Sequence, residues 1–276
     1  MARFTPAAAL AAATLSFAPW TPAPPAERAA VEETVGHYFK GGDTGSSAEM
    51  RKAFHPAAMM FFVDKEGAMT GVSMPEWFAR IDANSKDAKP ALSRKVAMVD
   101  VDGDAAVAKL VSTVPNMQIE DYMFLLRVGG TWRIVGKIFH RTESAAASSA
   151  PAAGTADADR TAARAAAEEL MQAVDANDAQ RLGAAADARA MSYTLFDGQL
   201  VGVPVAELQA RLAARRKTGA AEKPDSRVAA VDVEGNCGAA KIERTVSGAR
   251  HVDYASLLKV DGKWKIVGVV SVRRSA

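Results

Sequence analysis

The sequence contains a single cysteine, Cys237, among 276 residues. One thiol cannot form a disulfide within the chain or build a cysteine-based zinc site. Only four histidines are present, and His37 and His140 share no spacing with other candidate ligands, so we predict no metal site. The formal net charge is only +2, and neither half is basic enough to indicate a nucleic-acid-binding face. We predict no cofactor and no nucleic-acid partner.

Long apolar runs are also scarce. Residues 7–18 form an Ala- and Leu-rich stretch after a single positive charge, and small residues around Ala23 and Ala26 offer cleavage points. The stretch is too short to span a bilayer, which requires about 20 apolar residues. We interpret residues 1–26 as a signal peptide, with a disordered N-terminal segment as the alternative. A secreted or periplasmic protein without a membrane span is expected.

The chain does contain an internal repeat. Aligning residues 94–142 with 226–274, at a constant spacing of 132 residues and without gaps, gives 21 identities in 49 positions. A repeat of this length predicts two domains of one fold. The segments that match best are 93–103 with 225–235, Asp121-Tyr122 with Asp253-Tyr254, and 132–136 with 264–268.

The repeat defines the predicted domain organisation. Domain 1 is expected over 27–143 and domain 2 over 159–276. Residues 144–158 contain Ala, Ser and Pro but no large apolar side chain, so they cannot contribute to a core and are predicted to be a flexible linker. Cys237 follows a turn at the start of a predicted strand of domain 2, which is more typical of a buried small side chain than of a nucleophile.

Hydrophobic spacing and turn signals predict the order of elements in domain 1. Apolar residues at helical spacing indicate a helix over 27–40 that ends at Gly41-Gly42. Two capping boxes, Ser46 with Glu49 and Ser73 with Glu76, predict two further helices. Strands are expected over 59–63, briefly after residue 67, and then over 93–101, 105–114, 118–128 and 131–141. This order predicts an α+β fold with helices on one face of a curved sheet.

Three motifs carry a family resemblance: Phe54-His55-Pro56-x-Ala58, Asp121-Tyr122-x-x-Leu125-Leu126 and Gly130-x-Trp132-x-Ile134-Val135. Together they resemble the nuclear transport factor 2-like superfamily, in the branch named putative lumazine-binding. The resemblance covers nearly all of 27–143 and, more weakly, 159–275. It implies two tandem cone-shaped barrels, each with three N-terminal helices packed on a curved, mostly antiparallel sheet that encloses an apolar pocket. It also implies dimers formed through the outer sheet face.

A pocket of this kind would be lined by large apolar and aromatic side chains. Domain 2 has lost several of them, since Ala185-Ala186-Asp187 stands where domain 1 has Phe54-His55-Pro56, and Leu208 replaces Trp77. We therefore expect a degenerate pocket in domain 2 and a ligand in domain 1. The predicted ligand-binding residues are Tyr38, Phe54, Phe62, Trp77, Ile81 and Tyr122.

Catalytic residues are harder to assign. Enzymes of this superfamily, such as ketosteroid isomerases, use carboxylates in an apolar cone, but Phe62 stands where the isomerases carry their base. Asp121 recurs as Asp253 in the copy that has lost other pocket features, which favours a structural role. His55 precedes Pro56 and is more typical of a residue that fixes a corner of the chain.

Three functions remain open. The first is an exported, non-catalytic module that binds a small apolar or aromatic ligand in the cone pocket of domain 1. The alternative is a small acid–base enzyme of isomerase, dehydratase or cyclase type that uses Asp121 or His55. A third is a structural pair that presents a surface to another protein. Because both faces of strand 121–128 are apolar, we also predict an intramolecular pseudo-dimer through the outer sheet faces.

Overall fold

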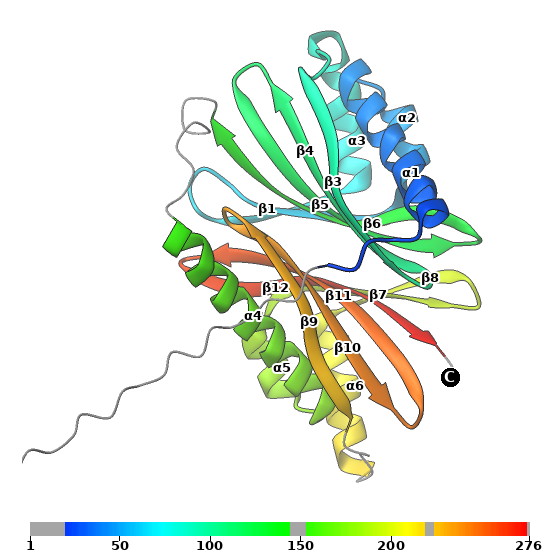
Figure 1. Cartoon of the computed structure of the whole chain (residues 1–276), viewed down its shortest axis with the longest axis vertical. Coiled ribbons are helices and arrows are strands. Elements are labelled where there is room, and N and C mark those ends of the chain that lie inside the picture. Colours follow the sequence, from blue (N-terminus) through cyan, green and yellow to red (C-terminus); the bar gives the residue numbers. More distant parts are fainter. Residues whose placement is uncertain (1–19, 144–152, 219–223, 275–276) are drawn as a thin grey trace, which may run out of the picture.

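The computed structural model describes residues 20–143, 153–218 and 224–274. Within these ranges each half repeats one order of elements, with two helices, two strands, a third helix and four long strands (Figure 1). Domain 1 consists of α1 (Pro25–Thr44), α2 (Ser47–Ala53), β1 (Phe54–Val63), β2 (Met69–Ser73), α3 (Met74–Ala83), the 3-10 turn η1 (Ser85–Asp87), β3 (Ser93–Asp102), β4 (Ala105–Val114), β5 (Met117–Val128) and β6 (Thr131–Glu143). Domain 2 consists of α4 (Ala153–Asp175), α5 (Ala179–Ala185), β7 (Ala186–Phe196), β8 (Gln199–Pro204), α6 (Val205–Thr218), β9 (Asp225–Glu234), β10 (Cys237–Val246), β11 (Ala249–Val260) and β12 (Lys263–Arg274). The predicted α+β class is confirmed.

Local sequence signals explain where the helices of domain 1 begin and end. Both predicted capping serines accept a hydrogen bond from the backbone N–H three residues later. The predicted stop of α1 at Gly41-Gly42 is wrong: the helix continues to Thr44 and ends at Gly45, whose φ of +63° is the left-handed cap that glycine favours. Gly41 instead allows a close approach of α1 to α2, because a Cβ there would lie 2.4 Å from Cγ of Met50.

Each domain builds one six-stranded sheet. The strand orders are β2-β1-β6-β5-β4-β3 and β8-β7-β12-β11-β10-β9. Neighbouring strands are antiparallel except for the pairs β1 with β6 and β7 with β12, which are parallel. Because β2 and β3 are the two edges of the first sheet, and β8 and β9 those of the second, both sheets are open. The predicted cone-shaped barrels are therefore curved open sheets rather than closed barrels.

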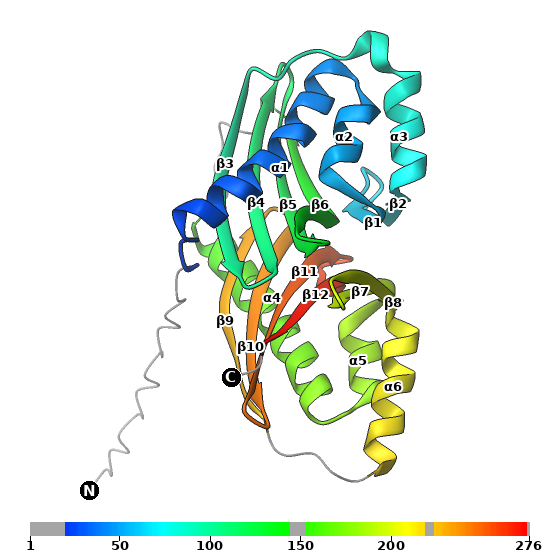
Figure 2. The ribbon, with the colours of Figure 1, turned by 90° about the vertical axis from the view of Figure 1, so that its right-hand side faces the viewer.

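The three helices of each domain cover the inner face of its sheet (Figure 2). In domain 1 the buried cluster between these layers contains large side chains, including Met50, Phe54, Phe78 and Ile134. The corresponding cluster of domain 2 is richer in alanine, as at Ala163, which α4 contributes. Domain 2 therefore has the same fold as domain 1, but smaller apolar side chains fill its core.

The outer faces of the two sheets pack against each other. A single buried cluster contains Tyr122, Phe124 and Leu126 from β5 of domain 1 together with Tyr254 and Leu258 from β11 of domain 2. The alternation of side chains along a strand sends Tyr122 to this outer face and its neighbour to the inner face. The apolar patterning of both faces of β5 is thereby explained, since helices cover one face and the second sheet covers the other.

Two polar networks cross the contact between the sheets, and each is the copy of the other at the spacing of 132 residues. Lys109 Nζ donates to Asp232 Oδ2 at 2.8 Å, and the Tyr122 hydroxyl donates to the same oxygen at 2.6 Å. Reciprocal contacts of this kind are what a two-fold symmetric interface requires. The copy consists of Lys241 Nζ and the Tyr254 hydroxyl, which both donate to Asp100 Oδ1, the lysine at 2.7 Å.

The boundary between the domains differs from the sequence prediction. α4 begins at Ala153, so residues 153–158 of the predicted linker are helical. Once a helix supplies its own backbone hydrogen bonds, an Ala-rich segment needs no large apolar side chain to be ordered. Residues 144–152 of the predicted linker lie outside the described ranges.

The segment ahead of α1 lies against both domains. The Trp20 ring stacks on Tyr254 with ring centroids 6.4 Å apart, and the backbone N–H of Thr21 donates to Asp100 Oδ2 at 3.0 Å. Pro25 and Ala26, which fall in the predicted signal segment 1–26, belong to α1. Residues 1–19 lie outside the described ranges. In the described part of the chain, no helix is both long and apolar enough to cross a membrane.

Candidate functional site

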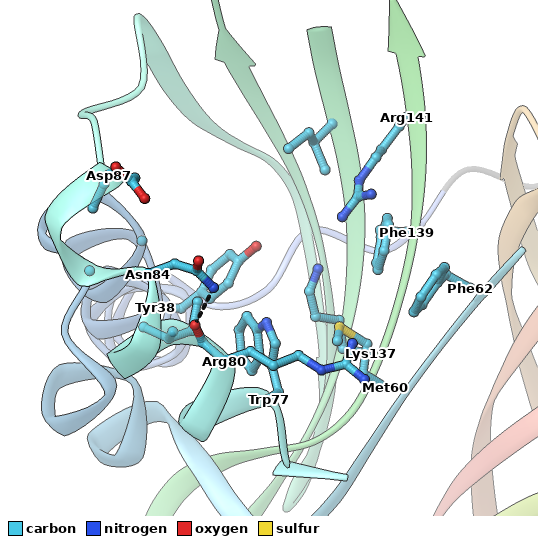
Figure 3. Close-up of a pocket in the computed structure, with 15 residues that line it drawn as sticks. Tyr38, Met60, Phe62, Trp77, Arg80, Asn84, Asp87, Lys137, Phe139 and Arg141 are labelled. Carbon is cyan, nitrogen blue, oxygen red and sulfur yellow. Dashed lines mark hydrogen bonds between the residues drawn. The ribbon is translucent and has the colours of Figure 1, made fainter. Parts of the chain in front are cut away.

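A cavity of about 450 Å³ lies in domain 1 between the helices and the inner face of the sheet (Figure 3). The helical side contributes residues of α1, α3 and the turn that follows α3, and the sheet side contributes residues of β1, β5 and β6. The side chains that surround it are Tyr38, Met60, Phe62, Trp77, Arg80, Ile81, Asn84, Asp87, Ala88, Ile119, Lys137, Phe139 and Arg141, together with the backbone at Gly42 and Gly45.

Aromatic rings form much of the cavity wall. Phe62 and Phe139 stack on the sheet side with ring centroids 4.9 Å apart and an interplanar angle of 25°. Tyr38 and Trp77 lie on the helical side with centroids 6.2 Å apart. Aromatic surfaces on both sides suit a flat apolar ligand, because such surfaces prefer offset stacking or edge contacts.

A buried polar cluster adjoins this aromatic wall. Asp121 is fully buried on β5 and accepts two hydrogen bonds, one from the Tyr38 hydroxyl at 2.9 Å on Oδ2 and one from Lys137 Nζ on Oδ1. Tyr38 and Lys137 both line the cavity, whereas Asp121 lies behind them. The carboxylate therefore acts on the cavity through its two partners rather than by direct contact.

Strand register explains why these groups meet. Asp121 lies opposite Phe139 and Met123 lies opposite Lys137 in the antiparallel pair of β5 with β6. Residues two positions apart share a face of the sheet, so Asp121, Lys137 and Phe139 all point to the inner face. Asp121 and Lys137 are diagonal neighbours, a separation that a long side chain can bridge.

The cluster has unusual protonation properties. Burial lowers the pKa of the Lys137 ammonium below its usual value, and the adjacent Asp121 carboxylate offsets this effect only in part. Burial also raises the pKa of Tyr38 well above its usual value, and the Asp121 carboxylate adds to that shift. Tyr38 is thus a neutral hydrogen-bond donor at neutral pH, while Lys137 is poised to lose its proton more readily than an ordinary lysine.

The charged side chains around the cavity are mostly cationic. Lys137 Nζ lies 4.3 Å from the centroid of the Phe139 ring, and the Arg141 guanidinium carbon lies 4.6 Å from the same centroid. Arg80 lies at the rim and pairs with Glu76 at 2.5 Å. An oxygen acceptor of a ligand would meet these donors, since a cluster of one sign of charge attracts the opposite sign.

The structure places four of the six predicted ligand-binding residues around the cavity: Tyr38, Phe62, Trp77 and Ile81. Phe54 lies behind them in the core, where its ring makes an edge contact with Trp77 at 5.4 Å between centroids. Tyr122 faces the other sheet and does not line the cavity, which corrects its place in the predicted set. Tyr122 follows Asp121 directly in β5, and consecutive residues of a strand point to opposite faces of the sheet.

The two residues predicted as alternatives for acid–base chemistry, Asp121 and His55, lie in different places relative to the cavity. Asp121 belongs to the cluster just described, where it accepts hydrogen bonds from the side chains of Tyr38 and Lys137. His55 is half-buried at the start of β1, where its Nδ1 accepts a hydrogen bond from the Ala57 N–H at 3.1 Å, and it does not line the cavity. Burial lowers the pKa of His55 as well. The Cys237 thiol lies fully buried between the sheets, and burial raises its pKa well above the usual value.

Sequence reasoning missed Lys137. A lysine within a strand is ordinarily a solvent-facing residue, and its neighbours Gly136 and Ile138 do not indicate its burial. A signal was nevertheless present, because residues 132–136 match 264–268 at four of five positions, and the residue that follows is lysine in domain 1 and Val269 in domain 2. Among the described residues, no group of three or more His, Cys, Asp or Glu side chains is placed to hold a metal ion.

Domain 2 also contains a cavity, of about 250 Å³, but its chemistry differs. At the spacing of 132 residues Leu170 replaces Tyr38 and Val269 replaces Lys137. Asp253, the copy of Asp121, pairs with Arg244 at 2.7 Å and accepts a hydrogen bond from Ser271 at 2.5 Å. Burial opposes the charge of Arg244, but Asp253 raises the pKa of this guanidinium, so Arg244 stays charged.

Comparison with known protein families finds one match in each half of the chain, in agreement with the internal repeat. A family model described as putative lumazine-binding matches residues 26–140 and again residues 158–270. A protein of Cladobotryum sp named aldolase FrzH is 26% identical over 114 residues, which is 40% of this chain and 88% of that protein.

Solved structures of similar proteins cover about one half of the chain. An NTF2-like protein of unknown function from Shewanella baltica is 32% identical, with a TM-score of 0.39, and covers 43% of this chain and 96% of its own. Another from Silicibacter pomeroyi is 23% identical, with a TM-score of 0.39, and covers 42% of this chain and 97% of its own.

We predict that Asp121 and Lys137 are energetically coupled. Asp121→Asn leaves a buried ammonium without its counter-charge, and Lys137→Met leaves a buried carboxylate with only Tyr38, so each should lower the free energy of unfolding by about 3 kcal/mol. The double variant should lose less than the sum, with a coupling of about 2 kcal/mol, measured by urea denaturation. Pairing Lys137→Met with Asp253→Asn of domain 2 is the control and should be additive. Additive losses for Asp121 and Lys137 would contradict the cluster.

Proposed function

The chain belongs to the putative lumazine-binding family of nuclear transport factor 2-like proteins, and from this premise we propose that domain 1 binds a small apolar or aromatic molecule in its cavity. The observation that carries the proposal is the aromatic cavity of about 450 Å³ beside the buried Lys137 and Tyr38. Ligand sites of proteins are typically apolar hollows with a few polar groups that orient the ligand. Domain 2, which lacks both polar groups, mainly supports the fold of domain 1.

The polar groups define the class of ligand further. The Tyr38 hydroxyl gives its one hydrogen to Asp121, whereas the Lys137 ammonium has three and gives one of them to Asp121, so the ligand should carry an oxygen acceptor such as a carbonyl or carboxylate for Lys137. The rings of Phe62, Phe139 and Trp77 would hold its flat apolar body. A simple probe with both features is 2-naphthoate, and 2-naphthalenemethanol offers the same body without the charge.

We predict that 2-naphthoate binds to the full chain and that Lys137→Met weakens this binding at least about tenfold, because a hydrogen bond to a charged group contributes about 1.5–3 kcal/mol. Binding of 2-naphthalenemethanol should change much less. Isothermal titration calorimetry measures both. Ile81→Arg, which fills the domain 1 cavity, should abolish binding, and Leu208→Arg, which places an arginine in the domain 2 cavity, should not. Equal effects of these two arginine variants would contradict a site in domain 1.

A second candidate function is a small enzyme. The Asp121, Tyr38 and Lys137 cluster favours it, because buried groups with shifted pKa values gather at sites of proton transfer. In such an enzyme Asp121, rather than His55, would be the acid–base residue, and it would act through Tyr38 and Lys137. The similar protein of Cladobotryum is named an aldolase, which is in keeping with carbonyl chemistry. Isomerase, dehydratase and cyclase chemistry remain within the same alternative.

We also propose that the two domains stay paired in solution as an intramolecular pseudo-dimer through their outer sheet faces. The shared apolar cluster and the two reciprocal networks support this arrangement. The short connection between the domains favours pairing within one chain, since it keeps their effective concentration high.

Paired domains should unfold together. Asp100→Asn removes the fully buried partner of Lys241 and should lower the free energy of unfolding by about 3 kcal/mol. We expect hydrogen exchange to rise in β5 of domain 1 and β11 of domain 2 alike, and light scattering to give the mass of one chain. Asp232→Asn, whose side chain is 25% exposed, should have a smaller effect. Increased exchange confined to domain 1, or a mass of two chains, would contradict pairing.

We propose, finally, that residues 1–26 direct export and that the mature protein is secreted or periplasmic. Cleavage after Ala23 or Ala26 would remove Trp20 and Thr21, which contact Tyr254 and Asp100. A chain produced with its own N-terminus in a bacterial host should be recovered from the periplasm in shortened form. Intact mass spectrometry checks this, and a full-length chain found only in the cytoplasm argues against export.

A further inference from the structure

Lys137 is the only lysine among the described residues that line the cavity of domain 1. Its side chain is 4% exposed, and its Nζ lies 4.3 Å from the centroid of Phe139 and 5.3 Å from that of Tyr38. A ligand whose flat body rests on these rings would bring its polar end to the amine. The cavity therefore presents a nitrogen nucleophile, held by packing, to whatever carbonyl enters it.

We propose that Lys137 is a Schiff-base lysine, whose amine condenses with the carbonyl carbon of an aromatic or apolar aldehyde or ketone bound in the domain 1 cavity. The inference rests on the proposed function, since it requires that this cavity bind a small molecule. It adds a covalent step, and it narrows the ligand from any oxygen acceptor to an aldehyde or ketone.

The reaction needs the amine without its proton. Burial and the neighbouring Arg141 disfavour the ammonium of Lys137, and a desolvated lysine is a stronger nucleophile at neutral pH. The proton has an acceptor in place, because Lys137 Nζ donates to Asp121 Oδ1. Transfer along this hydrogen bond converts a buried ion pair into a neutral amine and a neutral acid without changing the total charge of the cavity.

The atoms and protons of the condensation balance with these groups alone. The amine lone pair forms a C–N bond with the carbonyl carbon, the C=O pair moves to oxygen, and a proton passes from nitrogen to that oxygen to give a neutral carbinolamine. The C–O bond then breaks, the leaving oxygen takes the proton held on Asp121, and water departs. Tyr38 donates to Asp121 and lines the cavity, so its hydroxyl can relay this proton. The products are an iminium on Lys137, water and the carboxylate of Asp121, with no oxidant or reductant.

Other buried lysines lack this combination. Lys109 lies between Asp232 and Glu234 at the contact between the domains, and although burial disfavours its charge, these carboxylates raise its pKa. Lys241 bonds Asp100 in the corresponding network and also lies away from both cavities. The equivalent of Lys137 in domain 2 is Val269. The nucleophile is therefore specific to one cavity of the pair.

Reductive trapping tests the proposal. The full chain is incubated with 2-naphthaldehyde and sodium cyanoborohydride near neutral pH, which converts an imine into a stable secondary amine, and peptide mass spectrometry locates the naphthylmethyl group. We expect Lys137 to be modified at least about tenfold faster than the exposed Lys65, because a bound aldehyde is held beside the Lys137 amine and burial lowers the pKa of that amine. Lys109, in the same sample, should remain unmodified. Modification spread over exposed lysines without preference for Lys137 would overturn the proposal.

Two variants separate the covalent step from binding and from folding. Lys137→Arg keeps the positive charge beside Asp121 and should lose the adduct while still binding 2-naphthoate. Asp121→Asn tests Asp121 as a positioning residue: without the anion the ammonium is less stable, so the pH dependence of trapping should move to lower pH. An unmoved pH profile in a variant that remains folded by circular dichroism would remove Asp121 from the mechanism. Binding of 2-naphthoate without any Lys137 adduct in the natural chain would overturn the Schiff base alone, whereas loss of both would overturn the proposed function as well.

Discussion

Burial of two sheet faces against each other is the constraint on which the rest of the structure depends. β5 and β11 are apolar on both faces, and a sheet of that kind is stable only when both faces are covered. Helices cover the inner faces, and the two domains cover each other's outer faces. Because the outer face is already covered by a packed apolar cluster, the inner face of domain 1 can be hollowed into a cavity without exposing the sheet on both sides.

The duplicated carboxylate shows how one scaffold supports two kinds of chemistry. Asp121 and Asp253 occupy the same position in the two sheets and are both buried. Asp253 is paired with Arg244, whose guanidinium does not give up its proton in proteins, so that pair is a fixed ionic contact. Asp121 is paired with Lys137, whose amine can exist in either protonation state. The kind of cation beside the carboxylate thus distinguishes a structural ion pair from a reactive one.

The fold could be predicted from the sequence because its determinants are local. Hairpin turns at Gly103 and Gly130 and the capping boxes fix the strands and helices to within a few residues, and the 132-residue repeat fixes the number of domains. The end of α1 could not be predicted, because Gly41 serves a close contact with Met50 of another helix. The cavity wall was partly predictable from its aromatic residues. Lys137 was not, since its burial depends on β6 lying beside β5 beneath α1, which no local pattern encodes.

The fusion of two domains into one chain has a genetic consequence. In a homodimer built from a single gene product, every substitution in one subunit appears in the other, so an altered site must be acceptable twice. Here the two halves are encoded separately, so position 137 can carry lysine while its equivalent position 269 carries valine. Duplication within the chain therefore allows the interior of one half to differ from that of the other.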